Sequence, residues 1–98
     1  MPEILLLTEA ELRDCVRLDR RAIDLIADGF AALETDAVVM PPVLRMELRA
    51  VNGEVDVKTA YLPQLDSFTI KISPGFFDNP AKGLPSLKGG CFMVIETI

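Results

Sequence analysis

Three consecutive segments of alternating apolar and polar residues constrain the fold more than any other feature of this sequence. They cover residues 43–51, 54–62 and 67–73, and apolar side chains recur at every second position in each. A period of two is typical of strands with one buried face and one polar face. Asn52-Gly53, a strong hairpin signal, separates the first two segments, and Pro63-Gln64-Leu65-Asp66 separates the next two. The pattern predicts an antiparallel meander.

The residues before the meander predict two helices. Residues 4–7 form an apolar run that is typical of a short buried strand. Thr8 and Glu11 then match a capping box, which predicts a helix over about residues 9–15. Asp19 fits the N-cap of a second helix, because an apolar stripe with helical spacing follows it. We therefore expect an α+β fold, with two N-terminal helices packed on an antiparallel or mixed sheet.

The last part of the chain combines a long loop with a further strand. Residues 74–90 are rich in proline and glycine, and Phe76 and Phe77 indicate that this loop is packed. Residues 91–98 begin another apolar strand, and the chain ends inside it. We therefore expect residues 1–98 to be one N-terminal domain of a longer protein.

Composition excludes several classes of function. The net charge of −5 lacks the basic footprint of a nucleic-acid-binding protein, and the absence of histidine excludes histidine catalysis and histidine metal sites within this chain. No apolar run is long enough for a membrane span or a secretory signal. Cys15 and Cys91 are expected to be free thiols, which favours a cytoplasmic location.

The turn lengths decide whether three basic side chains share one face of the sheet. The four-residue turn pairs Leu62 with Ser67, and therefore Lys58 with Lys71. An even-numbered loop in the first hairpin leaves Arg45 on the face of Lys58, either diagonal to it or directly opposite. A two-residue loop would also place Glu47 opposite Lys58. We predict a row of three cations across three adjacent strands.

Two interpretations of this row remain open, because like charges directly opposed in a sheet are destabilising. In the first, the row faces solvent, and Glu47, Glu54 and Asp56 pair with the cations. In the second, the row binds an anion such as a carboxylate, for which arginine supplies a bidentate fork. Ser86 is a weaker candidate: without a histidine it is not an activated nucleophile, and a loop hydroxyl often bonds nearby backbone.

Longer motifs bring a resemblance to a known family. The series MPPVLRMEL, then GEVDVKTAYLPQLDSFTIKISPGFFDNPAKGLPSLKGG and an apolar strand, resembles the N-terminal part of the ornithine cyclodeaminase/mu-crystallin family. The ectoine-utilisation cyclodeaminase-like branch is the most similar. The resemblance runs from about Ile4 to the end of the chain. It is most specific over residues 52–88, which include the pattern N-P-x-x-G-L-P-[ST].

The resemblance implies the substrate and dimerisation domain of a two-domain enzyme. A Rossmann domain that binds NAD or NADP would follow this region, outside the present chain. Members act on amino acids, imino acids or related compounds by hydride transfer, and they are typically homodimers joined through this sheet domain. One mu-crystallin relative binds a hormone, so a non-enzymatic binding or dimerisation module is the alternative.

The resemblance also implies roles for individual residues. Arg45 matches the arginine that grips the substrate carboxylate, and Lys71 matches the active-site lysine at that carboxylate. Ser86 stands where many members have a threonine that lines the substrate and nicotinamide pocket. Lys58 departs from ornithine-specific members, in which an acid at this position suits a distal amine, so we expect a substrate other than ornithine. The family's catalytic aspartate would lie beyond Ile98, so this chain alone is not expected to be active.

Overall fold

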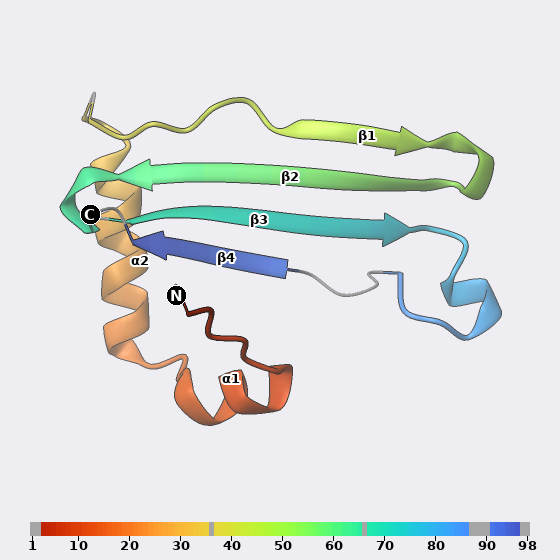
Figure 1. The fold of residues 1–98 in the computed structure, drawn as a ribbon, viewed down its shortest axis with the longest axis horizontal. Helices are drawn as coiled ribbons and strands as arrows, with labels where there is room; N and C mark the ends of the chain where they lie inside the picture. The colour runs from red at the N-terminus through yellow and green to blue at the C-terminus, as the bar shows by residue number, and fades with distance from the viewer. Residues whose placement is uncertain (1–2, 36, 66, 87–90, 97–98) are drawn as a thin grey trace. The chain divides into compact units, whose positions relative to one another are not determined.

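The computed structural model describes residues 3–35, 37–65, 67–86 and 91–96 (Figure 1). The chain divides into two units, Met1–Glu34 and Thr35–Ile98. The first contains both helices and the second contains the sheet. The α+β composition is thus confirmed, whereas the packing of the helices on the sheet stays a prediction.

Helix α1 spans Glu9–Cys15 and begins where the capping box predicts. The Thr8 hydroxyl oxygen accepts a hydrogen bond from the Glu11 amide at 3.2 Å. The return contact is made between side chains, because the Thr8 hydroxyl donates to Glu11 Oε1 at 3.2 Å. The cap satisfies one of the amides that a helix N-terminus leaves without an intrahelical partner.

Helix α2 spans Arg20–Ala32 and also begins at its predicted cap. Asp19 Oδ1 accepts a hydrogen bond from the Ala22 amide at 3.0 Å. A side-chain acceptor at this position is worth about 1 kcal/mol to a helix. Both helices therefore start at short polar residues, as local hydrogen bonding dictates.

The predicted strand at residues 4–7 is wrong. These residues have no regular secondary structure, and all four leucine and isoleucine side chains are exposed. A strand needs a neighbour that completes its hydrogen bonds. None of the strands in the described part of the sheet pairs with this run, so apolar composition alone did not produce a strand.

The sheet is the predicted antiparallel meander. Its described strands are β1 (Leu44–Leu48), β2 (Gly53–Leu62), β3 (Ser67–Phe76) and β4 (Cys91–Glu96), and they lie side by side in chain order (Figure 1). Each neighbouring pair is antiparallel. Outside these strands, Val39 forms an isolated bridge with Tyr61.

The first hairpin differs from the Asn52-Gly53 turn that its sequence indicates. Leu48 pairs with Gly53, so the connection has four residues and contains a short 3-10 helix, η1 (Arg49–Val51). A type I′ turn needs positive φ at both central residues, and of these two only Asn52 has it, with φ 47°. Gly53 instead begins β2 and lies against β3. A Cβ atom there would come within 2.8 Å of Phe76 Cδ1.

The second hairpin follows its prediction. Leu62 pairs with Ser67 across η2 (Pro63–Leu65), while Asp66 lies outside the described residues. Strand β3 continues three residues past the predicted end at Ser73 and reaches Phe76. The predicted loop is correspondingly shorter and contains a further 3-10 helix, η3 (Pro80–Lys82). Phe77 is exposed, so the expectation that it packs is wrong.

The sheet has one apolar and one polar face, as the alternation predicts. Paired positions in neighbouring strands point to the same side. The apolar face of β1–β3 carries Leu44, Met46, Leu48, Val55, Val57, Tyr61, Phe68, Ile70 and Ile72. In the described residues the core is small, since Ala32 is the one hydrophobic side chain that counts as buried, at 9% exposure. Among the described helices, none is both long and apolar enough to cross a membrane.

Candidate anion-binding site

The polar face brings three predicted cations together. Lys58 pairs directly with Lys71 across β2 and β3. Arg45 pairs with Asp56, so it lies one diagonal step from Lys58 on the same face. The prediction that the three cations share one face is confirmed, and a connection over residues 49–52, which neither predicted register contains, makes the row diagonal. The alternative position of Glu47 opposite Lys58 is wrong, because Glu47 pairs with Glu54.

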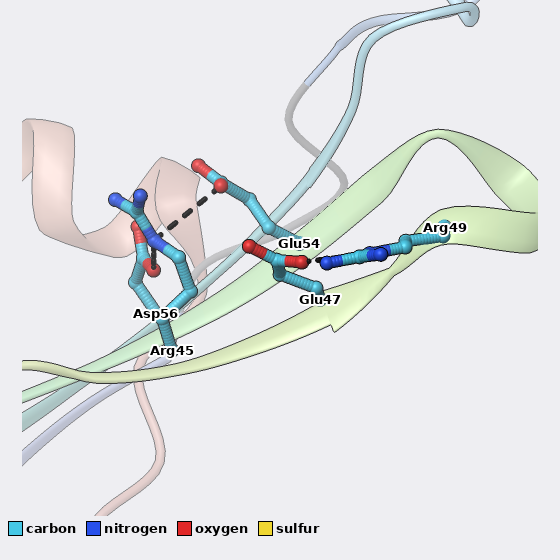
Figure 2. A network of polar contacts seen from close by, with 5 residues as sticks. All are labelled: Arg45, Glu47, Arg49, Glu54 and Asp56. Carbon is cyan, nitrogen blue, oxygen red and sulfur yellow. Dashed lines mark hydrogen bonds and ion pairs between the residues drawn. The ribbon is translucent and has the colours of Figure 1, made fainter.

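Arg45 lies between two carboxylates (Figure 2). Its Nε atom is 2.9 Å from Asp56 Oδ1 and 3.4 Å from Glu54 Oε2. The side chains of Asp56 and Glu54 are 15% and 27% exposed, whereas that of Arg45 is 55% exposed. The hydrogen bond to Asp56 raises the pKa of the Arg45 guanidinium above its ordinary value, and the negative charges of Asp56 and Glu54 raise it further.

These contacts leave Arg45 able to bind a further anion. A guanidinium has five N–H donors, and the closest approach of both carboxylates is to the single donor on Nε. The half-exposed side chain can therefore offer donors to a ligand that approaches from solvent. Arginine is positively charged at any physiological pH, so Arg45 presents a permanent charge to such a ligand.

A second ion pair lies next to this cluster. Glu47 Oε2 is 3.0 Å from Arg49 Nε, and both side chains are largely exposed (Figure 2). The acids of the polar face thus pair with arginines, as the solvent-face interpretation expects, although Glu47 is bound by Arg49 rather than by the row. Exposed pairs of this kind contribute little to stability.

The two lysines differ in their surroundings. Lys58 is exposed, whereas Lys71 is half-buried in β3 between its neighbours β2 and β4. Their direct pairing places two positive charges on adjacent strands. Such a pair costs free energy unless negative groups lie near. Asp56, two positions before Lys58 on the same face, is one such group.

Ser86 is not brought beside the row. Its carbonyl oxygen accepts a hydrogen bond of 2.6 Å from the Phe76 amide at the end of β3. Phe76 lies five residues beyond Lys71, which corresponds to roughly 17 Å of strand. Ser86 can therefore contact a ligand at the row only if that ligand, or a bound cofactor, extends along β3.

The members of the row differ in exposure: Arg45 and Lys58 are exposed, whereas Lys71 is half-buried. A shallow hollow of about 200 Å³ lies elsewhere on the sheet, lined by residues such as Val39, Tyr61 and Phe68. Among the described residues, no group of three or more acidic, cysteine or histidine side chains could hold a metal ion.

Sequence reasoning missed two structural features near these candidates. Neither register predicted for the first hairpin pairs Arg45 with Asp56, because both place the turn too late in the chain. It also gave no role to Asn79, which is 9% exposed in the segment between Phe76 and Ser86. The Asn-Pro dipeptide was the available signal, since asparagine side chains often bond neighbouring backbone in turns.

Comparisons with known proteins identify two close homologues. No family model matches the chain. It is 61% identical over 89 residues to a Rhizobium meliloti protein named "Putative dehydrogenase", covering 91% of this chain. It is 57% identical over 90 residues to an "Uncharacterized cyclodeaminase" from Sinorhizobium fredii, again covering 91% of the chain. The chain spans 27% of the length of each relative.

A solved structure shares the fold. It is a chain of an archaeal alanine dehydrogenase, a dimer with bound NAD, and it matches with a TM-score of 0.78 at 22% sequence identity. The match covers 92% of this chain and 26% of the dehydrogenase chain. The arrangement of elements found here therefore occurs as one part of a larger protein.

Proposed function

We propose that this chain is the N-terminal substrate-binding and dimerisation domain of an NAD(P)-dependent oxidoreductase of the ornithine-cyclodeaminase type. The complete enzyme would act on an amino or imino acid. A compound from ectoine degradation is the substrate that the sequence resemblance favours, and ornithine is disfavoured by Lys58. A homodimer in the cytoplasm is the form that we propose for the protein.

One observation carries this proposal: Arg45, Lys58 and Lys71 share one face of the sheet, in the register that the anion-site interpretation requires. Three cations gathered on the surface of a chain with a net charge of −5 need a compensating anion or nearby acids. Asp56 and Glu54 approach the Nε donor of Arg45, which leaves its other N–H donors for a carboxylate, and the opposed lysines add positive charge on the same face.

The comparisons support the same proposal at a coarser level. The homologues are named as a dehydrogenase and a cyclodeaminase, and the structural neighbour is a dehydrogenase with bound NAD. All three are several times longer than this chain. A catalytic partner domain outside the chain is therefore consistent with their lengths, and so is a dimer.

In the proposed mechanism, the residues of this chain bind and orient the substrate. Arg45 and Lys71 hold the substrate carboxylate, so that the α-carbon is directed toward the nicotinamide, and Lys58 contacts the rest of the molecule. Fixing a reactant in this way lowers the entropic part of the barrier. The nicotinamide supplies hydride chemistry when bound. Its dinucleotide is assigned mainly to the second domain, because this sequence has no glycine-rich dinucleotide fingerprint.

A second candidate is a non-enzymatic binding or dimerisation module. The exposure of Arg45 and Lys58 favours it, since exposed cations can bind an anion without excluding water for catalysis. Turnover distinguishes an enzyme from a non-enzymatic binding module. The complete protein, screened against amino and imino acids while nicotinamide absorbance is followed, should show turnover if it is an enzyme.

The sharpest test of the site is the Arg45→Ala substitution in the complete protein. Losing a charge-paired carboxylate contact should lower kcat/KM by about thirtyfold or more for the best substrate of that screen. Arg49→Ala is the matched control, because Arg49 is also paired with a glutamate but lies outside the row. Equal kcat/KM values for wild type and Arg45→Ala would remove Arg45 from the site.

A further inference from the structure

The segment that follows β3 closes back on the strand it leaves. The Phe76 amide donates to the Ser86 carbonyl at 2.6 Å, and the Phe76 carbonyl accepts from the Asn79 amide at 3.2 Å. Both backbone groups of Phe76 are thus used to close residues 77–86 into a loop, which we call the Asn79 loop. Loops with close ends and internal packing form compact units that often carry function.

Asn79 occupies the centre of this loop. Its side-chain Nδ2 donates to the Pro85 carbonyl at 3.0 Å. Its own carbonyl accepts from the Lys82 amide at 2.9 Å and from the Leu84 amide at 3.0 Å. Asn79 is 9% exposed, and burying an amide is favourable only when it is hydrogen-bonded. The loop is therefore built around this one side chain.

The start of the loop is held separately, at the first hairpin. The Phe77 amide donates to the Asn52 carbonyl at 3.0 Å, and Asn52 Nδ2 donates to Asp78 Oδ1 at 2.9 Å. The side-chain contact is exposed. It does not reach Pro85 or Ser86, so it provides a natural control for the role of Asn79.

The hydrogen bonds of Asn79 and Phe76 act on the two peptide planes that flank Ser86. The Pro85 carbonyl, which Asn79 holds, belongs to the same planar peptide unit as the Ser86 nitrogen. The Ser86 carbonyl, which Phe76 holds, belongs to the next unit. With both planes fixed, φ and ψ of Ser86 are fixed, and so is the direction of its Cα–Cβ bond.

We propose that Asn79 is a positioning residue that sets the direction of the Ser86 Cα–Cβ bond, and with it the positions that the Ser86 hydroxyl can reach. This inference rests on the proposed function, in which Ser86 lines the substrate and nicotinamide pocket. It adds that the backbone at Ser86 is held by hydrogen bonds within the chain itself. Asn79 itself does not contact the reacting atoms.

Hydrogen exchange in the complete protein tests whether Asn79 holds the loop in place. Asn79→Asp keeps the side-chain volume but replaces the donor with an oxygen that repels the Pro85 carbonyl. Exchange of the Phe76 and Leu84 amides should accelerate about tenfold or more, while amides of the central β2–β3 ladder stay unchanged. Asp78→Ala should leave both amides protected. Protection within twofold of wild type in Asn79→Asp would overturn the inference.

A double-mutant cycle tests whether Asn79 affects the reaction through Ser86. It uses the amino or imino acid that the screen identifies as substrate. Ser86→Ala and Asn79→Asp should each lower kcat/KM, and Asn79→Asp should add less than about twofold in the Ser86→Ala background. Fully additive losses would overturn the inference. An unchanged kcat/KM in Ser86→Ala would instead contradict the proposed role of Ser86. If Asn79→Asp does not fold, Asn79→Ala removes the same donor without adding a charge.

Discussion

At the scale of single residues, the polar face of the sheet combines attraction and repulsion within a few side chains. Arg45 is held by Asp56 and Glu54, whereas Lys58 directly faces Lys71. In the first arrangement, the two carboxylates offset the positive charge of Arg45. The second places two like charges on adjacent strands, which costs free energy unless negative groups lie near.

Lys58→Glu should therefore change both stability and selectivity in the complete protein. An opposite-charge pair with Lys71 replaces a like-charge pair, so the free energy of unfolding should rise by up to about 1 kcal/mol at low salt. Substrate preference should move toward molecules with a distal amine, because the new carboxylate would attract it. Urea denaturation at two salt concentrations and a substrate screen measure the two effects.

Lys82→Glu is the control for this substitution, because Lys82 is an exposed lysine in η3 and has no place in the row. The charge change is the same. If Lys58→Glu and Lys82→Glu shift stability and selectivity equally, the position of Lys58 opposite Lys71 has no specific effect.

At the scale of elements, two glycines show how backbone proximity decides the effect of one methyl group. Gly53 begins β2, and an added Cβ would meet Phe76 Cδ1 at 2.8 Å and the Gly75 carbonyl oxygen at 2.9 Å. Gly29 lies within α2, and an added Cβ would meet nothing within 4 Å. Substituting alanine for glycine should therefore change the free energy of unfolding in opposite directions at these two positions.

Gly53→Ala should lower the free energy of unfolding of the complete protein by about 1–3 kcal/mol, because the strand pair must shift to admit the methyl group. Gly29→Ala should raise it by up to about 1 kcal/mol, since alanine is a better helix former than glycine. Chemical denaturation of both variants measures the difference. Two changes of the same sign would contradict the close approach of β2 and β3 at Gly53.

At the scale of the whole molecule, both units carry large exposed apolar side chains. Large hydrophobic side chains are exposed in the N-terminal run, in α2 and on β1. Contiguous exposed apolar surface marks sites that another part of the protein, or another protein, covers. The lengths of the homologues and the dimeric structural neighbour are in keeping with such covering.

The complete protein and the separate 98-residue chain should therefore behave differently in solution. The complete protein should be a dimer by light scattering and bind little of a hydrophobic dye such as ANS, because its apolar surface is covered. The 98-residue chain should bind ANS strongly and self-associate. A monomeric chain of 98 residues without dye binding would show that its exposed side chains need no partner.

The sequence by itself determined the features that depend on neighbours along the chain. Thr8 and Asp19 mark both helix starts because capping bonds span three residues. The alternation and the second turn predict that Lys58 faces Lys71. Side chains alternate with a period of two, and a turn of four residues that pairs Leu62 with Ser67 also pairs Lys58 with Lys71. The resemblance to the cyclodeaminase family also came from sequence, and the named homologues support it.

The tertiary structure decided the features that depend on contacts between distant residues. The first hairpin is centred two residues earlier than an Asn52-Gly53 turn would be, so Arg45 lies opposite Asp56. Gly53 then lies against Phe76, where a Cβ atom would come too close. The burial of Asn79 likewise depends on how its loop closes. Residues 4–7 lack a strand because strand formation requires a paired neighbour, which no local pattern can supply.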